Sequence, residues 1–150
     1  MVLFCLKIAA MDIKESKKFI NLGIIVNNKD KVLMIRRKQK EVGGNGAVLE
    51  WAFPGGKQRF GETREQCVER EVLDETGYDV ESIKQISLRV HPEILVLIVY
   101  HLCRLKTEKP VAEPKEPDEV AEIKWVKKQN IKNLITTNLD EKVSKELNLL

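Results

Sequence analysis

The chain has 150 residues, 43% of them hydrophobic and 33% charged, with 26 basic and 23 acidic side chains and a net charge of +3. This composition excludes a disordered chain, and the length predicts a single domain over residues 1–150. The small net charge argues against a nucleic-acid partner, and no hydrophobic run reaches the roughly 20 residues of a membrane helix. We expect a cytoplasmic protein that is a monomer or a homodimer.

Residues 1–10 are mostly hydrophobic, but they lack the basic start of a secretory signal and are interrupted by Lys7. They are expected to be a non-native or disordered extension of the domain, with Met11 as an alternative start. The three cysteines are odd in number and widely spaced. This spacing favours reduced thiols over a disulfide framework or a zinc site.

The first predicted strands lie over residues 19–26 and 32–35, which are largely hydrophobic and flank four polar residues. Such a pattern predicts a β-hairpin. A glycine-rich loop at 43–46 precedes a short predicted strand over 48–53. The Pro-Gly-Gly sequence at 54–56 then predicts a break in the regular pairing of strands.

A helix is predicted from Thr63 to about Glu75. Thr63 is a suitable N-cap, and Glu65 and Gln66 occupy the first turn. Gly77 is placed to end the helix. The sequence therefore marks both ends of this element.

Two more strands are predicted over residues 82–90 and 94–105, the second almost wholly hydrophobic and hence central in a sheet. Residues 106–118 contain three prolines, which excludes regular structure and indicates a surface loop. A strand over 120–126 and helical periodicity from residue 129 complete the chain. Strands first, a helix inside and helices last predict a mixed α/β (α+β) fold in layers.

Glu71, Asp74 and Glu75 have the spacing i, i+3 and i+4, so their carboxylates share one face of the predicted helix. Their mutual repulsion is relieved when a hard divalent cation lies between them. Oxygen ligands favour Mg²⁺, with Mn²⁺ as a substitute, over zinc. The alternative is an acidic helix face that is simply solvated.

The residues around these acids favour the metal site. Gly55 and Gly56, next to Lys57, allow the backbone to approach a ligand closely. Arg70 can pair with a neighbouring carboxylate and hold it in place. Glu62 stands just before the helix, where it can accept backbone amides or reach the metal cluster.

Six residues of this region have a characteristic spacing: Gly56, Glu62, Arg70, Glu71, Glu75 and Gly77. The pattern resembles the Nudix box, G-x(5)-E-x(7)-R-E-U-x-E-E-x-G-U, in which U is a bulky hydrophobic residue. The resemblance covers residues 56–78. Asp74 replaces the first glutamate of the E-E pair and Tyr78 occupies the last hydrophobic position, so no carboxylate is lost.

The resemblance implies an α/β/α sandwich with a mixed central sheet and a loop-helix-loop metal site. It implies that Glu71 and Glu75 are the principal Mg²⁺ ligands. In such proteins the residue at Asp74 often supports a further ion, and the carbonyl of the glycine that matches Gly55 completes the coordination. Members often add an acid from the loop before the last strand, and Glu119 is the candidate there for a fourth ligand or general base. Its alternative is a solvated loop acid.

The implied reaction is attack of water on phosphorus, with metal ions that neutralise the pyrophosphate oxygens and lower the pKa of a bound water. Glu119 or a glutamate of the box would take the proton. The expected catalytic residues are Glu71, Glu75, Glu119 and Arg70. The candidates for binding the substrate are Arg36, Arg37, Lys57, Arg59 and Trp51. The two strand arginines could instead be exposed surface residues, and Trp51 could belong to the core rather than stack on a base.

The sequence WAFPGGK at residues 51–57 resembles the MutT-type hydrolases, which convert nucleoside triphosphates to a monophosphate and pyrophosphate. Pro92, 15 residues beyond Gly77, is similar to the proline position of ADP-ribose pyrophosphatases. ADP-ribose or another nucleoside-diphosphate sugar is therefore the alternative substrate, although a proline can also simply fix a turn. A non-catalytic Nudix-like module that binds nucleotide or RNA is a further alternative, which the intact acids and the 5% aromatic content disfavour.

Overall fold

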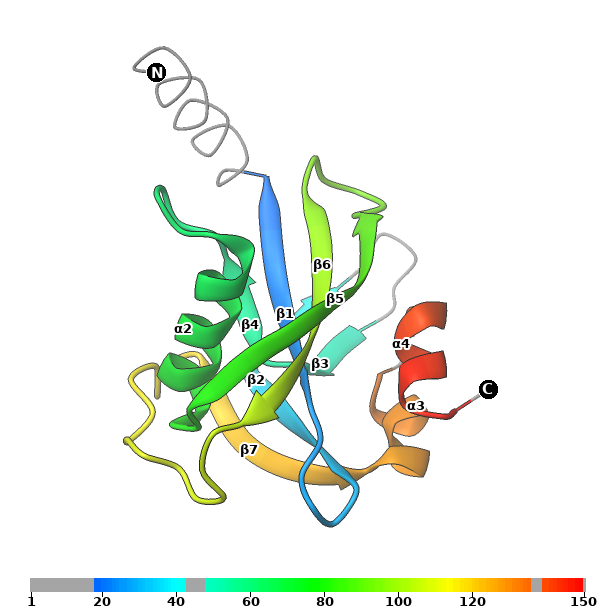
Figure 1. The fold of residues 1–150 in the computed structure, drawn as a ribbon. Coiled ribbons are helices and arrows are strands. Elements are labelled where there is room, and N and C mark those ends of the chain that lie inside the picture. The colour runs from blue at the N-terminus through cyan, green and yellow to red at the C-terminus, as the bar shows by residue number, and fades with distance from the viewer. Residues whose placement is uncertain (1–17, 43–47, 136–138, 150) are drawn as a thin grey trace.

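The computed structural model describes residues 18–42, 48–135 and 139–149. Two β-sheets lie between helix α2 (Arg64–Thr76) on one side and helices α3 (Ile131–Leu134) and α4 (Glu141–Glu146) on the other (Figure 1). This arrangement confirms the predicted mixed α/β fold. The expectations for residues 1–10, Met11 and the loop 43–46 lie outside the described residues.

The strands of the described residues are β1 (Phe19–Ile25), β2 (Lys31–Val42), β3 (Val48–Ala52), β4 (Gly55–Lys57), β5 (Val80–Val90), β6 (Leu97–Leu105) and β7 (Val120–Lys127). A four-stranded sheet has the order β4-β1-β6-β5. It is mixed, because β1 and β6 are parallel and the other neighbours are antiparallel. A three-stranded antiparallel sheet has the order β3-β2-β7.

The predicted hairpin of the first two strands is wrong, because β1 and β2 belong to different sheets. Their pairing is limited to one bridge, between Val26 and Val32. The turn between them forms as the polar residues indicate, since the side chain of Asn27 accepts the N–H groups of Lys29 and Lys31 at 3.0 and 2.9 Å. The turn chemistry is local, whereas packing on both faces of β1 decides its neighbours.

The predicted break is confirmed at residues 53 and 54, where the pairing of β3 ends, but it is wrong for the two glycines, since Gly55 begins the short strand β4, which pairs with β1 in the other sheet. Gly55 has a φ of +153°, and a Cβ at this position would lie 2.0 Å from the backbone oxygen of Asn21. Only glycine permits this approach of the two strands. The glycines therefore let the chain pair closely rather than end the pairing.

Helix α2 forms at the place and with the ends that the sequence predicts. The Thr63 hydroxyl accepts the N–H of Gln66, and the Gln66 side chain accepts the N–H of Thr63 at 3.0 Å, which is a complete capping box. Gly77, with a φ of 79°, caps the C-terminus, and its N–H donates to the carbonyl of Leu73 at 2.8 Å.

The later elements differ from the prediction at their ends. Strand β6 begins at Leu97 rather than at residue 94, and Leu95 has an exposed fraction of 95%. The helical tail is divided into a 3-10 turn η1 (Lys128–Asn130) and the short helices α3 and α4. The prediction of a loop over residues 106–118 is confirmed, as is the strand that follows it.

Two hydrophobic clusters pack against the four-stranded sheet from opposite sides, because neighbouring residues of a strand face opposite ways. Ile25 of β1 packs in the cluster that contains Val68 and Val72 of α2. Ile24 packs in the other cluster, together with Val143 and Leu147 at the C-terminal end. Helix α2 is thereby held against β1, and this contact positions the acids of the helix.

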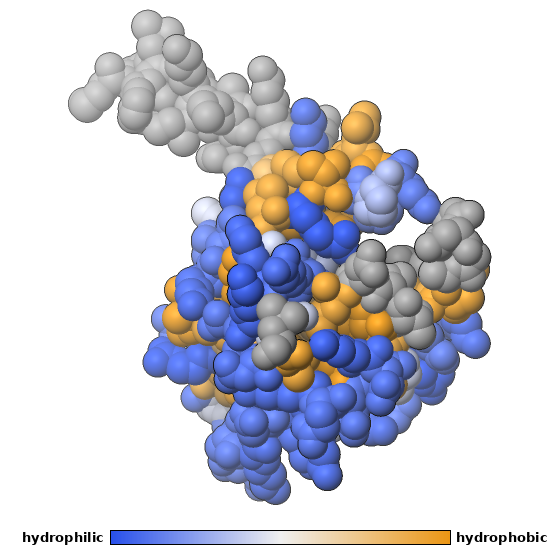
Figure 2. All heavy atoms as spheres, turned by 90° about the vertical axis from the view of Figure 1, so that its right-hand side faces the viewer, coloured by the Kyte–Doolittle hydropathy of each residue, from blue (hydrophilic) through white to orange (hydrophobic). Residues whose placement is uncertain are grey.

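The surface of the described residues is mostly polar, and several of its exposed hydrophobic side chains lie at and next to the connection between β5 and β6. Val90, Ile94 and Leu95 have exposed fractions of 66%, 52% and 95%. Figure 2 shows hydrophobic atoms near the top of one face, at the end where β5 connects to β6. The longest described helix, α2, has 13 residues, and no helix in the described parts of the chain is long and apolar enough to cross a bilayer. Cys67 and Cys103 are buried free thiols.

Candidate active site

Three carboxylates from two segments meet at the C-terminal half of α2. Glu71 and Glu75 come from the helix, and Glu116 comes from the loop between β6 and β7. One carboxylate oxygen of each lies within 4.8 Å of the others. Three oxygen ligands at this separation suit a hard divalent cation. Glu116 was missed by the sequence reasoning, which placed this role on Glu119.

Glu116 is distinguished from the other acids of its loop only by its position in three dimensions. Glu116, Asp118 and Glu119 lie close together in one loop before the last strand, so their position in the sequence does not distinguish them. Glu119 is exposed, whereas Glu116 is half-buried. Burial raises the pKa of Glu116, and the negative charges of Glu71 and Glu119 raise it further. These carboxylates therefore repel one another at short range.

Glu75 is the most buried acid of the site, with an exposed fraction of 6%. The backbone N–H of Gly55 donates to Glu75 Oε1 at 2.7 Å. Burial raises the pKa of Glu75 to about 8, and the charge of Glu71 adds to this shift, while the Gly55 amide and the charge of Arg37 oppose it. A cation beside Glu75 would favour its ionised form at neutral pH.

The guanidinium of Arg70 donates hydrogen bonds to two acids, Glu62 and Glu71. Its Nε and Nη2 donate to the two carboxylate oxygens of Glu62 at 2.5 and 3.0 Å, and its Nη1 donates to Glu71 Oε1 at 2.9 Å. The hydrogen bond from Arg70 is the main cause that lowers the pKa of Glu62. Fork-shaped pairing of this kind restricts both carboxylates to one orientation.

Asp74 lies near two cations, and its charge also raises the pKa of Glu116. Its oxygens lie 3.9 Å from Arg70 Nη1 and 3.6 Å from Lys115 Nζ. The expectation that Asp74 supports a further metal ion stays a prediction. Gly56 lies directly against the site, since a Cβ there would be 2.7 Å from the carboxylate carbon of Glu71.

The loop that carries Glu116 is fastened to the C-terminal end of α2. The carbonyl of Gly77 accepts the N–H groups of Val111 and Ala112 at 2.8 and 3.3 Å. The N–H of Lys115 donates to the carbonyl of Asp74 at 2.7 Å. These bonds satisfy carbonyls that every helix leaves unpaired at its end, and they place Glu116 beside the helix.

A cavity of about 470 Å³ adjoins the site at Glu75, the one of the three clustered carboxylates that lines it. Glu75 and Glu119 contribute its acidic lining, and Arg37 and Lys40 contribute positive charge. The lining therefore combines carboxylate oxygens with the positive charges of Arg37 and Lys40.

Two of the other predicted substrate residues, Arg36 and Trp51, do not line the described cavity. Arg36 pairs with Glu122 at 3.2 Å and with Glu50 at 3.7 Å. Trp51 is half-buried against the core cluster of Ile24, and Lys124 Nζ lies 6.0 Å from its ring centroid.

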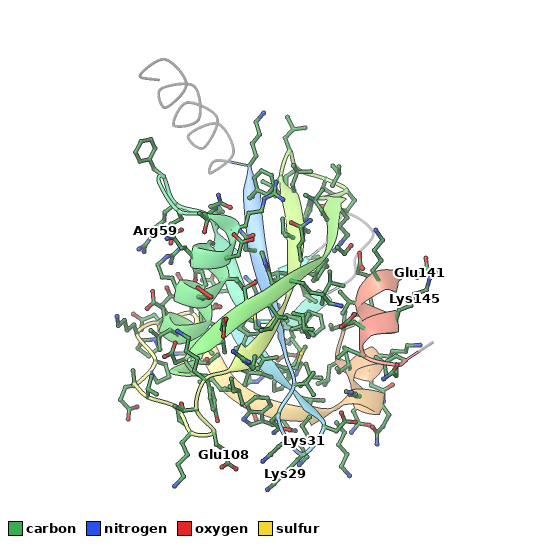
Figure 3. The ribbon with its side chains drawn as sticks, in the orientation of Figure 1. Lys29, Lys31, Arg59, Glu108, Glu141 and Lys145 are labelled. Carbon is green, nitrogen blue, oxygen red and sulfur yellow. The ribbon has the colours of Figure 1, made fainter. Side chains whose placement is uncertain are left out.

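Lys57 and Arg59 contact the Arg70–Glu62 pair through their backbone atoms. The carbonyl of Lys57 accepts Arg70 Nη2 at 3.2 Å, and the N–H of Arg59 donates to Glu62 at 2.7 Å. Figure 3 shows the Arg59 side chain extending from the loop before α2, away from the sheets. Of these five residues, Arg37 is the one that lines the described cavity.

A sequence model of the NUDIX domain matches residues 17–147. A Caenorhabditis elegans protein named as a nudix hydrolase is 33% identical over 79 residues, which are 51% of this chain and 20% of that protein. A Bacillus subtilis (strain 168) protein, whose name describes an 8-oxo-dGTP diphosphatase, is 31% identical over 70 residues, 47% of this chain and 42% of that protein. The chain thus spans less than half the length of these relatives.

Solved structures share the fold at low sequence identity. A crystal structure of a NUDIX hydrolase from Nitrosomonas europaea matches with a TM-score of 0.68 at 22% identity, over 89% of this chain and 71% of that chain. A match at this low identity shows that the fold is shared, and the shared fold confirms the layered arrangement predicted from the sequence.

Proposed function

The chain belongs to the NUDIX domain family, and on that basis we propose that it is a Mg²⁺-dependent hydrolase that cleaves the pyrophosphate linkage of a nucleotide-like substrate. The observation that carries this proposal is the cluster of Glu71, Glu75 and Glu116, of which Glu75 lines a cavity together with Arg37 and Lys40. A phosphate group in this cavity would lie near both the carboxylates that bind the metal ion and the positively charged side chains.

The donor set fits a divalent cation. Glu71, Glu75 and Glu116 supply hard oxygen ligands, which suit Mg²⁺ or Mn²⁺. The carbonyl of Gly55, whose own N–H donates to Glu75, is proposed as a further ligand. When bound there, the ion would neutralise charge on the pyrophosphate and lower the pKa of water.

The remaining roles are assigned to side chains of the chain itself. Arg70 holds Glu71 in one orientation through its hydrogen bond of 2.9 Å. Arg37 and Lys40, which line the cavity, are proposed to bind the phosphate. Glu119 is exposed at the cavity and is proposed to accept the proton of the attacking water.

A nucleoside triphosphate, cleaved to the monophosphate and pyrophosphate, is the proposed substrate. The name of the Bacillus subtilis relative, an 8-oxo-dGTP diphosphatase, supports this choice. ADP-ribose or another nucleoside-diphosphate sugar is the alternative, which the position of Pro92 in the sequence suggested. In the structure this proline is exposed, between β5 and β6. Turnover measured on triphosphates, ADP-ribose and dinucleoside polyphosphates distinguishes these substrate classes.

The decisive test of the reaction compares Glu75→Gln with the wild type in Mg²⁺. The amide oxygen of the variant can still accept the Gly55 N–H, so the fold is expected to persist while the ligand charge is lost. Turnover should fall by at least about a hundredfold, because the site would lose a direct metal ligand. Glu65→Gln, an exposed change in the first turn of the same helix, is the matched control and should retain full activity.

Full Mg²⁺-dependent turnover by Glu75→Gln would contradict the proposed site. Tight nucleotide binding by the wild type without turnover in Mg²⁺ or Mn²⁺ would instead indicate the non-catalytic binding module.

A further inference from the structure

A chain of buried polar side chains runs from β6 through β1 to the loop after β4. His101 of β6 and Asn21 of β1 are fully buried, and Gln58 has an exposed fraction of 6%. His101 Nε2 lies 2.8 Å from Asn21 Oδ1, and Asn21 Nδ2 donates to Gln58 Oε1 at 2.9 Å. Gln58 Nε2 donates to the backbone carbonyl of Glu62 at 3.1 Å. Polar groups this deeply buried are costly unless each is paired.

Each hydrogen bond of this chain has a single direction. The carbonyl of Glu62 can only accept, so Gln58 uses its NH₂ group there and offers its oxygen to Asn21. Asn21 accordingly offers its own oxygen to His101, which donates from Nε2 as a neutral ring. Burial lowers the pKa of His101 to about 4, so the ring is neutral and its other nitrogen, 3.2 Å from Ser82 Oγ, accepts the hydroxyl proton. The chain is therefore completely satisfied in one arrangement.

Glu62 is the residue at which this chain reaches the candidate active site. Its backbone carbonyl accepts Gln58, while its carboxylate accepts Arg70 Nε at 2.5 Å. The same guanidinium donates to Glu71 at 2.9 Å. A shift of the loop 58–62 would consequently move Arg70 relative to Glu71.

We infer that Asn21, Gln58 and His101 are positioning residues for the candidate active site. Their hydrogen bonds hold the loop 58–62 against β1, so that Glu62 keeps Arg70 on the carboxylate of Glu71. Asn21 and His101 come from β1 and β6, far from the helix in sequence, and they supply an orientation that the helix alone does not fix. The inference rests on the proposed function for its effect on turnover, but its effect on Arg70 can be measured separately.

The test compares Gln58→Met and Asn21→Leu with the wild type. Both changes replace an amide side chain with a hydrophobic one of similar length. Gln58→Met removes the hydrogen bond to the Glu62 carbonyl, and Asn21→Leu removes the bonds of Asn21 to Gln58 and His101. Exchange of the Arg70 Nε–H with solvent, followed by NMR, reports on the Arg70–Glu62 contact without any substrate. We expect exchange at least about tenfold faster in both variants, because the contact opens more often.

Ser82→Ala is the matched control. It removes a hydrogen bond at the opposite end of the chain, on His101 Nδ1, and leaves every bond between His101 and Glu62 in place. Circular dichroism verifies that all variants are folded under the conditions of the exchange measurement. Wild-type exchange of the Arg70 Nε–H in both Gln58→Met and Asn21→Leu overturns the inference. Equal acceleration in Ser82→Ala also overturns it, because the effect would then be a general loosening.

Turnover in Mg²⁺ provides the second readout. Gln58→Met should lower kcat by about 10- to 100-fold, the usual effect of losing a group that orients a metal ligand, with KM nearly unchanged. Combined with Glu62→Gln, its effect on kcat should be far less than multiplicative, whereas the effects of Ser82→Ala and Glu62→Gln should multiply. A wild type that hydrolyses none of the substrates would refute the proposed function, while the exchange measurement would still decide the positioning role.

Discussion

The backbone amide of Gly55 and the carboxylate of Glu75, 20 residues apart in the chain, are joined by a buried hydrogen bond of 2.7 Å. The bond ties the short strand β4 to the C-terminal half of α2. It also places the most buried acid of the candidate site against the backbone of the glycine-rich turn. The hydrogen bond requires the backbone conformation of Gly55, whose φ is +153°.

Gly55→Ala is expected to destabilise the protein by about 3 kcal/mol or more, because a Cβ would overlap the Asn21 backbone and because the φ of +153° is strained for alanine. Gly61→Ala is the control, since Gly61 also has a positive φ, +79°, but no atom within 4 Å of the added Cβ. The control should cost about 1 kcal/mol from backbone strain alone. Urea unfolding measures both free energies, and equal losses would contradict the steric explanation.

Arg37→Gln and Arg36→Gln separate two neighbouring arginines. Arg37 lines the cavity with Glu75, whereas Arg36 pairs with Glu122 and Glu50. Removing a charge-assisted phosphate contact of about 1.5 to 3 kcal/mol should raise KM at least about tenfold in Arg37→Gln. Steady-state kinetics should show a KM near the wild-type value for Arg36→Gln. A larger effect from Arg36 would place the phosphate on the other side of β2.

Glu116→Gln and Glu119→Gln distinguish the two loop glutamates. Glu116 has an oxygen within 4.8 Å of those of Glu71 and Glu75, so its substitution should weaken Mn²⁺ binding at least about tenfold. Glu119 is exposed at the cavity, so its substitution should lower kcat while Mn²⁺ affinity stays near that of the wild type. Mn²⁺ titration by electron paramagnetic resonance gives the affinities. The reverse pattern would restore Glu119 as the ligand.

His101 should make the stability depend on pH. Burial lowers the pKa of His101 from 6.5 to about 4; the charge of Glu65 opposes this shift, and the charge of Arg64 adds to it. Between these values the unfolded chain binds a proton that the folded protein does not, so stability is lost as the pH falls from 6.5 to about 4. The full loss is about 3 kcal/mol.

The measurement is the difference in unfolding free energy between the wild type and His101→Gln, taken at several pH values. Contributions from other groups, including Glu75, are common to both proteins and largely cancel. The advantage of the wild type should shrink as the pH falls through this window. A difference that does not change with pH would show that the ring is not held neutral by burial.

Sequence patterns predicted elements wherever the controlling interactions are local. The ends of α2 follow from Thr63, Gln66 and Gly77, which act through hydrogen bonds within a few residues. The shared helix face of Glu71 and Glu75 follows from the period of the helix alone. These contacts hold in any fold that contains the helix, so they could be inferred without one.

Pairing between distant strands could not be inferred in this way. The pattern of β1 and β2 is the pattern of a hairpin, yet they join different sheets, because both faces of β1 are buried and its neighbours are β4 and β6. Likewise the chain alone marks 54–56 as a turn, although its glycines serve for close approach to β1. Hydrophobic pattern specifies that a strand is buried, but not which strand lies next to it.

By itself the sequence determined the helix, its row of acids and the spacing of the Nudix box. The tertiary structure decided which loop acid meets them, since Glu116 is brought to Glu71 and Glu75 by backbone bonds of its loop to the end of α2. It also decided which of two adjacent arginines faces the cavity, and it joined His101 and Asn21 to the loop before the helix. Local patterns fix what a segment can form, whereas contacts between segments depend on how the whole core packs.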